Sequence, residues 1–116
     1  PVIILPKSHK DGLCIYSRPA KYAGKVGAYQ IGIYDEDEVV SKYNQVAPLT
    51  EPGDLLLMDF LTIHGSGINR AIHSRWSIQN RFFNYEDPTG LQIGWKGSIT
   101  GETQVEKVFP DNFIED

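Results

Sequence analysis

The chain has 116 residues, and its 41% hydrophobic and 22% charged content is ordinary for one globular domain and excludes a disordered chain. The net charge of −4 and the acidic run Asp35–Glu38 argue against a nucleic-acid partner, because phosphate binding requires a basic patch. The longest purely apolar runs have about four residues, far fewer than a membrane span needs, so we expect no membrane partner.

Cys14 is the single cysteine of the chain, which excludes an internal disulfide bond. A lone free cysteine fits a reducing compartment. We therefore expect a cytoplasmic protein.

The apolar segments are short, rich in β-branched and aromatic residues, and separated by glycine and proline. Helical periodicity is nearly absent, so the sequence predicts an all-β domain. In chain order, the expected strands are Val2–Leu5, Leu13–Ser17, Tyr29–Tyr34, Asn44–Leu49, Asp54–Ile63, Ser74–Tyr85 and Gln104–Phe109.

Two of the connections between these strands have a readable local chemistry. In Glu51–Asp54, Pro52 fixes φ and Gly53 supplies the positive φ of a type II turn. The acidic run Asp35–Glu38 is expected to be a solvated loop or strand end.

The segment Asp54–Phe60 is apolar on both faces, which predicts a central strand buried on both sides. His64 follows just past the end of this strand, where rigid scaffolds carry ligand-binding residues. Gly65 and Gly67 would allow a sharp turn and a close approach there.

The strand Ser74–Tyr85 begins with one polar and one apolar face. Arg75 and Ser77 lie on the polar face, while Trp76 and Ile78 lie on the other. The polar face either meets solvent or lines a cavity that binds a polar ligand, and the periodicity is the same in both cases.

One chemistry would use both His64 and Arg75. A non-haem iron(II) oxygenase holds its metal with two histidines and one carboxylate, and leaves positions open for oxygen and a co-substrate. The distal carboxylate of the co-substrate 2-oxoglutarate suits the fixed, bidentate guanidinium of an arginine. Ser77, on the same face as Arg75, could donate to the same carboxylate.

Three segments carry a further pattern: ILPKSHKDGL (4–13), PLTEPGDLLLMDFLTIHGSGINRA (48–71) and RWSIQNRFFNY (75–85). Together they resemble the phytanoyl-CoA dioxygenase family. That family has Pro-Gly-Ser/Thr-His-Lys, then Pro-Gly-Asp opening an apolar strand, then His-Gly-Ser-Gly-x-Asn, then an arginine. One departure is Lys7, which stands where the family usually has glycine, in a turn.

The resemblance implies a fold, two cofactors and a reaction. The fold is a double-stranded β-helix, a cupin-like jelly roll. The cofactors are Fe(II) and 2-oxoglutarate, with His64 as the distal iron ligand and with Ser66 and Arg75 in contact with 2-oxoglutarate. The reaction couples oxidative decarboxylation of 2-oxoglutarate to hydroxylation of an unactivated C–H bond of a small-molecule substrate by O2. We accordingly expect Arg75 and Ser77 to face the barrel interior.

The remaining two iron ligands should form a His-x-Asp motif. His9-Lys10-Asp11 has this form, but His9 matches the separate Ser-His-Lys segment of the family, so we interpret it as a decoy. His73 is expected to be a surface residue. Residues 1–116 are then a single domain that lacks the N-terminal side of its jelly roll and its His-x-Asp motif. Such a chain is expected to be inactive alone, and exposed sheet edges would favour self-association.

Two alternatives remain open. One is a non-catalytic β-sandwich or cupin-like binding module, in which His64 only packs or forms hydrogen bonds. The other is a halogenase-like relative, in which the upstream carboxylate is replaced so that chloride binds iron.

Overall fold

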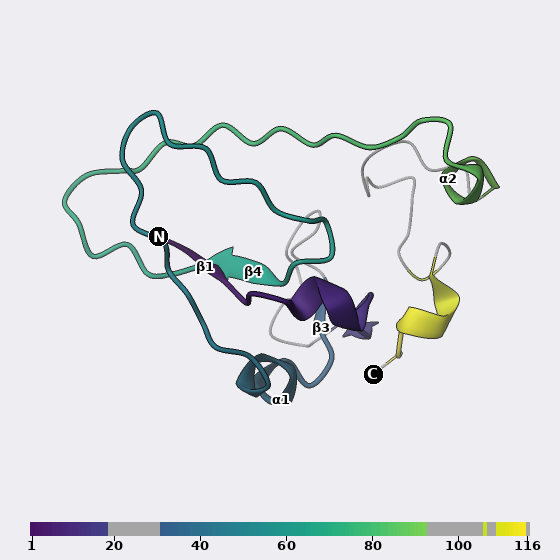
Figure 1. Cartoon of the computed structure of the whole chain (residues 1–116). Coiled ribbons are helices and arrows are strands. Elements are labelled where there is room, and N and C mark those ends of the chain that lie inside the picture. Colours follow the sequence, from purple (N-terminus) through teal and green to yellow (C-terminus); the bar gives the residue numbers. More distant parts are fainter. Residues whose placement is uncertain (19–30, 93–105, 107–108, 116) are drawn as a thin grey trace. The chain divides into compact units, whose positions relative to one another are not determined.

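The computed structural model describes residues 1–18, 31–92, 106 and 109–115 (Figure 1). The chain divides into two compact units, one formed by Pro1–Cys14 and Asp35–Arg75, the other by Ile15–Tyr34 and Trp76–Asp116. The first unit contains β1 (Val2–Ile4), the 3-10 helix η1 (Ser8–Asp11), α1 (Glu36–Ser41) and β4 (His64–Ser66). The second contains β2 (Tyr16–Ser17), β3 (Gly32–Ile33), α2 (Pro88–Gln92) and the 3-10 helix η4 (Pro110–Asn112).

In the first unit, β1 pairs with β4 as an antiparallel ladder in which Val2 faces Ser66 and Ile4 faces His64 (Figure 1). Ile4 also exchanges two backbone hydrogen bonds with Val46, at 2.8 and 2.9 Å. Consequently β1 lies between β4 and the segment around Val46. The predicted strand Val2–Leu5 is confirmed over Val2–Ile4, whereas Asn44–Leu49 contributes the single bridge at Val46.

The two faces of this ladder differ in burial. Leu5, at 3% exposure, is the buried hydrophobic side chain of the described residues. Successive side chains of a strand point to opposite faces, so Leu5 lies on the face opposite to Ile4 and its partner His64. The ladder thus presents His64 on the face away from the buried Leu5.

The predicted type II turn at Glu51–Asp54 is confirmed. Gly53 has φ 100°, and the Asp54 N–H donates to the Glu51 carbonyl at 3.1 Å. The Asp54 carboxylate in turn accepts the Glu51 N–H at 2.8 Å. Proline and glycine at the two central positions are sufficient for this geometry, which is why the sequence alone predicts it.

The acidic run Asp35–Glu38 is exposed as expected, but it forms the start of α1, where a loop or strand end was predicted. Carboxylates in the first turn interact favourably with the positive end of the helix dipole. The ammonium group of Lys42 lies 3.2 Å from the carboxylate of Glu38, one turn earlier. These local charges favour a helix that shows no apolar periodicity.

In the second unit, β2 pairs with β3 as an antiparallel ladder of two residues each, within the predicted strands Leu13–Ser17 and Tyr29–Tyr34. Tyr16 also bridges to Phe113, and its carbonyl accepts the Ile114 N–H at 2.8 Å. Arg18 forms an ion pair with Glu106 at 2.5 Å. This unit therefore joins β2 to residues near the C-terminus.

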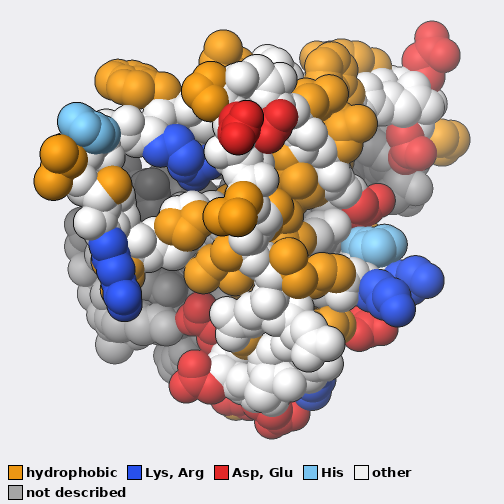
Figure 2. Space-filling view, turned by 60° about the vertical axis from the view of Figure 1, so that its left-hand side comes forward, with side chains coloured by type: hydrophobic (Ala, Val, Ile, Leu, Met, Phe, Trp, Pro, Cys, Tyr) orange, Lys and Arg blue, Asp and Glu red, His pale blue; other side chains and the backbone are white. Residues whose placement is uncertain are grey.

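Two segments that were predicted as strands have no ladder in the described residues, Asp54–Ile63 and Ser74–Tyr85. Their large apolar side chains are exposed, for example Leu57 at 81%, Trp76 at 93% and Ile78 at 91%. Figure 2 shows hydrophobic side chains on the outer surface. The predicted burial of Asp54–Phe60 is therefore not observed, because no second layer of described residues covers this segment.

The double-stranded β-helix stays a prediction, since the described residues form two short antiparallel ladders. The predicted strand Gln104–Phe109 lies mostly outside the described residues. Across the ranges that the structure describes, no helix combines the length and hydrophobicity needed to cross a membrane.

Candidate functional site

His64 is the first residue of β4, whereas the sequence placed it just past the end of a strand. A turn built by Asp59 precedes it. The Asp59 carboxylate accepts the Leu61 N–H at 2.8 Å, and its carbonyl accepts the Thr62 N–H at 3.0 Å. The chain therefore enters β4 in a defined direction, with His64 held opposite Ile4.

The imidazole ring of His64 is oriented by its own backbone. Its Nδ1 lies 2.9 Å from the carbonyl oxygen of Thr62, a buried residue. A carbonyl oxygen only accepts hydrogen bonds, so Nδ1 must carry the proton. In the neutral ring Nε2 then keeps its lone pair, and the side chain is exposed. His64 is thus an exposed residue whose imidazole is oriented by a hydrogen bond from Nδ1 to the Thr62 carbonyl.

Ser66 follows two residues later on β4, so its side chain lies on the same face of the strand as His64. Both side chains are exposed. The structure therefore brings together two of the four predicted site residues.

The two glycines beside Ser66 behave differently from each other. Gly65 lies within β4, where an added Cβ would meet no atom within 4 Å. Gly67 donates its N–H to the Pro1 carbonyl at 2.8 Å, and an added Cβ would lie 3.3 Å from Pro1 and Ile3. A close approach is therefore present at Gly67 alone, and neither glycine has a positive φ.

Arg75 lies in the first unit with His64, and it is exposed. Asn69 organises the loop before it: its side-chain oxygen accepts the Ala71 N–H at 3.0 Å and its amide donates to the His73 carbonyl at 3.1 Å. Ser77 belongs to the second unit and is also exposed. Within the described part of the first unit, no hydrogen bond or ion pair joins Arg75 to the His64–Ser66 pair.

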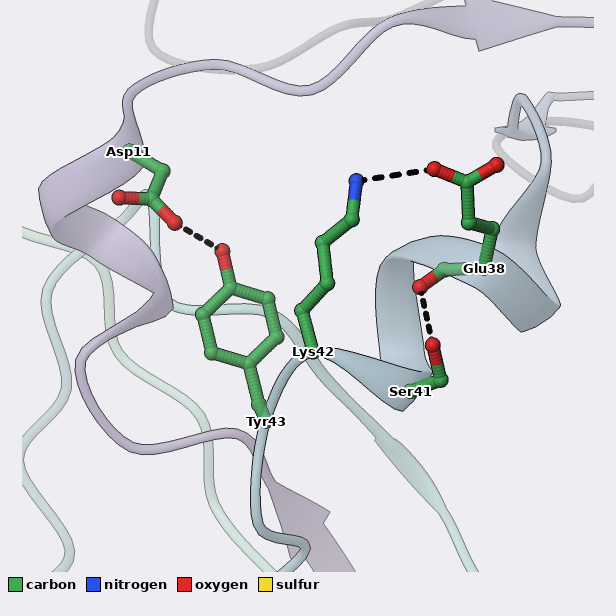
Figure 3. A network of polar contacts seen from close by, with 5 residues as sticks. All are labelled: Asp11, Glu38, Ser41, Lys42 and Tyr43. Atoms are coloured by element: carbon green, nitrogen blue, oxygen red, sulfur yellow. Dashed lines mark hydrogen bonds and ion pairs between the residues drawn. The ribbon is translucent and has the colours of Figure 1, made fainter.

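His9 and Asp11 lie in η1, and Asp11 is engaged elsewhere. Its carboxylate accepts a hydrogen bond from the Tyr43 hydroxyl, as Figure 3 shows next to the Lys42–Glu38 ion pair. Within the described ranges, no three His, Cys, Asp or Glu side chains gather where they could hold a metal ion. His9, Asp11 and His64 therefore form no such group in this structure.

Asp11 also affects two neighbouring titratable groups. The hydrogen bond to Asp11 raises the pKa of the Tyr43 hydroxyl, with smaller contributions from burial and charge. Burial, and then the negative charge of Asp11, raise the pKa of the Cys14 thiol. Cys14 is therefore less reactive than a solvent-exposed cysteine with an ordinary pKa, because the thiolate is the nucleophile.

Sequence reasoning missed three residues that shape this region: Ser8, Asp59 and Asn69. The side-chain oxygens of Asp59 and Asn69 each accept the backbone N–H two residues later. Asp and Asn commonly form such turns, so these two could have been predicted from the sequence. Ser8 is fully buried at 0% exposure and bonds a residue 55 positions away, for which the sequence gives no signal.

A scan against models of protein families, a search of curated proteins and a search of solved structures found no match to this chain.

Proposed function

We propose that the chain is part of an Fe(II)- and 2-oxoglutarate-dependent dioxygenase that hydroxylates a small organic substrate. The proposal joins the family-like motifs of the sequence to the state of one side chain, His64. The double-stranded β-helix is part of the proposal, with the His64–Ser66 strand on its inner side.

The observation that carries the proposal is the hydrogen bond from His64 Nδ1 to the Thr62 carbonyl, at 2.9 Å. Metal-binding histidines in proteins almost always donate their second ring nitrogen to a carboxylate, a carbonyl or water. This bond fixes the tautomer and directs the lone pair of the other nitrogen to the metal. His64 has this arrangement on an exposed strand, as a metal ligand would need.

The donor chemistry fits iron at this position but does not complete its site. His64 would supply one imidazole ligand through Nε2, and a facial triad needs a second histidine and a carboxylate. Those two ligands would come from outside the described residues. The exposed apolar side chains of Asp54–Ile63 support this view, because they are suited to packing against further strands. Iron with 2-oxoglutarate would supply the oxidising power for C–H hydroxylation.

Two further residues of this chain would bind 2-oxoglutarate. Ser66 presents its hydroxyl on the same strand face as His64, where it could donate to a carboxylate. Arg75 is an exposed guanidinium that could clamp the distal carboxylate in a bidentate manner. Both roles leave the chemistry of the prime substrate open.

The proposal is tested with the protein expressed over its entire natural reading frame. Without oxygen, Fe(II) and 2-oxoglutarate together should give the visible charge-transfer band of their chelate. His64→Ala should abolish the band, and His73→Ala should leave it unchanged as the matched control. With oxygen, succinate should form in an Fe(II)-dependent manner.

Two outcomes contradict the proposal. A protein that gives neither band nor succinate would fit a binding module, and a band that survives in His64→Ala would place the metal elsewhere. Incorporation of chloride into the product would identify the halogenase-like alternative.

A further inference from the structure

The buried hydroxyl of Ser8 reaches the residue before His64. Ser8 is 0% exposed, and its Oγ accepts the backbone N–H of Ile63 at 2.8 Å. A part-buried amide needs an acceptor, and the Ser8 oxygen supplies it. The bond joins the turn at the start of η1 to the chain just ahead of β4.

Both backbone polar groups of Ile63 are held by this same turn. The Leu5 N–H donates to the Ile63 carbonyl at 3.0 Å, while the Ser8 N–H donates to the Leu5 carbonyl at 3.2 Å and closes the turn. Ile63 is therefore fixed from both sides by residues that lie far away in the sequence.

The Ile63 N–H and the Thr62 carbonyl belong to the same peptide unit. This unit is trans and close to planar, so the two groups point in opposite directions. On one side the N–H meets Ser8 Oγ, and on the other the carbonyl oxygen meets His64 Nδ1 at 2.9 Å. Fixing one end of the peptide therefore fixes the other.

We propose that Ser8 is a positioning residue for His64: its hydroxyl holds the Thr62–Ile63 peptide in the rotation that keeps the proton of the imidazole on Nδ1. The inference rests on the proposed function in one respect only: the Nδ1-protonated tautomer would leave Nε2 free to bind a metal. Ser8 touches neither metal nor substrate.

Replacing Ser8 by Ala deletes one oxygen and leaves the Ile63 N–H without its acceptor. The peptide can then rotate, and the Thr62 carbonyl no longer holds the Nδ1 proton. Either ring nitrogen of a neutral imidazole can carry the proton, so His64 should become a mixture of tautomers. His73 should be unaffected and serves as the internal reference.

The test is a long-range ¹H–¹⁵N spectrum of the histidine rings above about pH 8, where an ordinary imidazole is neutral. In the wild-type chain His64 should carry its proton on Nδ1. Ser8→Ala should shift both ring nitrogens toward the averaged mixture, and Ser8→Thr, which keeps a hydroxyl, should restore the wild-type signals. Ser17→Ala, at a second serine that is fully buried among the described residues, should change nothing at His64.

Unchanged His64 signals in a folded Ser8→Ala variant would overturn the inference. If that variant does not fold, Ser8→Cys keeps the shape of the side chain with a slightly larger atom and offers only a weak acceptor, and unshifted His64 signals there overturn it equally. These spectra need no metal, so they stand apart from the test of the proposed function.

A second readout links the two proposals. In the protein expressed over its natural reading frame, Ser8→Ala should weaken Fe(II) binding by about 10- to 100-fold, the usual effect of losing an outer-shell partner, with an unchanged KM for 2-oxoglutarate. If Ser8→Ala shifts the tautomer of His64 but leaves the Fe(II) affinity unchanged, the proposed effect of Ser8 on metal binding is wrong. Absence of any Fe(II) site would instead refute the proposed function alone.

Discussion

Lys7 adopts a left-handed backbone conformation, with φ 73° and ψ −4°, directly before the buried Ser8. A side chain at such a position brings Cβ close to the following carbonyl oxygen, a strain that glycine avoids. The family that the sequence resembles usually has glycine here. The departure noted from the sequence therefore falls on a position where glycine has a physical advantage.

We expect Lys7→Gly to be neutral or to raise the free energy of unfolding by up to about 1.6 kcal/mol. Relief of left-handed strain, about 1–2 kcal/mol, is partly offset by the greater entropy of glycine in the unfolded chain, about 0.4–1 kcal/mol. Urea unfolding measures the difference. Asp35→Gly is the matched control, because Asp35 is also left-handed, with φ 49°, and aspartate tolerates this region better. A larger gain at Asp35 would contradict the argument.

Under the proposed function, Arg75→Lys should raise the 2-oxoglutarate KM of the protein expressed over its natural reading frame, although the charge is kept. A lysine ammonium does not reproduce a bidentate clamp, and losing one charge-assisted hydrogen bond costs about 1.5–3 kcal/mol, or roughly ten- to hundredfold in affinity. Steady-state kinetics with varied 2-oxoglutarate measures this, with Arg70→Lys as the control. An unchanged KM would show that the carboxylate is held by another residue.

The Cys14 thiol should be alkylated more slowly in the folded chain than in urea at pH 8, since burial and Asp11 raise its pKa. Asp11→Asn should recover part of the rate and not all of it, because burial is the larger cause and remains. Asp35→Asn should have no effect. Equal rates of iodoacetamide alkylation in the folded and unfolded chain would contradict this expectation.

The same shift has a consequence for stability. A thiol whose pKa is higher in the folded state contributes stability that is fully present below its unfolded pKa, about 8.5, and is lost as the pH rises through its folded pKa. The free energy of unfolding should therefore fall above about pH 8.5, and less so in Cys14→Ser.

At the scale of elements, the sequence predicted those turns and strands that depend on a few neighbouring residues. The turn at Gly53 and the strand β1 could be read from the sequence, because proline, glycine and a short β-branched run act over a few residues. α1 was missed, since charges at its first turn support it without an apolar stripe. Ser74–Tyr85 begins with the alternating polar and apolar residues of a strand, yet it forms no ladder in the described residues. A strand also needs a neighbouring strand to pair with, and the alternation does not identify that neighbour.

The junction of β1 and η1 should carry much of the stability of the first unit. Leu5→Ala should lower the free energy of unfolding by about 2–5 kcal/mol, because Leu5 is only 3% exposed. Leu57→Ala is the matched control at 81% exposure and should change it by less than about 0.5 kcal/mol. Urea unfolding followed by circular dichroism compares them, and similar losses would mean that Leu57 is covered in solution.

At the scale of the whole molecule, the described residues hold one predicted metal ligand and many exposed apolar side chains (Figure 2). The motifs single out the residues of the proposed site, and of these His64 and Ser66 share a strand face. They did not predict the support of His64 by Ser8, because burial and pairing across 55 residues depend on the complete arrangement of the chain.

We expect the 116-residue chain alone to bind Fe(II) weakly and to leave 2-oxoglutarate unconsumed, because one imidazole does not hold iron(II) against water. Anaerobic titration and succinate assays measure both. Tight stoichiometric binding that disappears in His9→Ala and Asp11→Ala would make His9-Lys10-Asp11 the real motif. Sedimentation should also show self-association through the exposed apolar segments, which would be absent if those segments were covered within one chain.

The bond between Ser8 and Ile63 closes a loop of 55 residues. Bringing the ends of such a loop together costs roughly 3.5 kcal/mol of chain entropy beyond a constant, whereas the turns Glu51–Asp54 and Asp59–Thr62 form without that cost. Folding should therefore complete the local turns early and orient His64 in a late, non-local step. Under the proposed function, the imidazole of His64 is not yet oriented in a nascent or partly unfolded chain. Such a chain should therefore bind iron only after folding is complete.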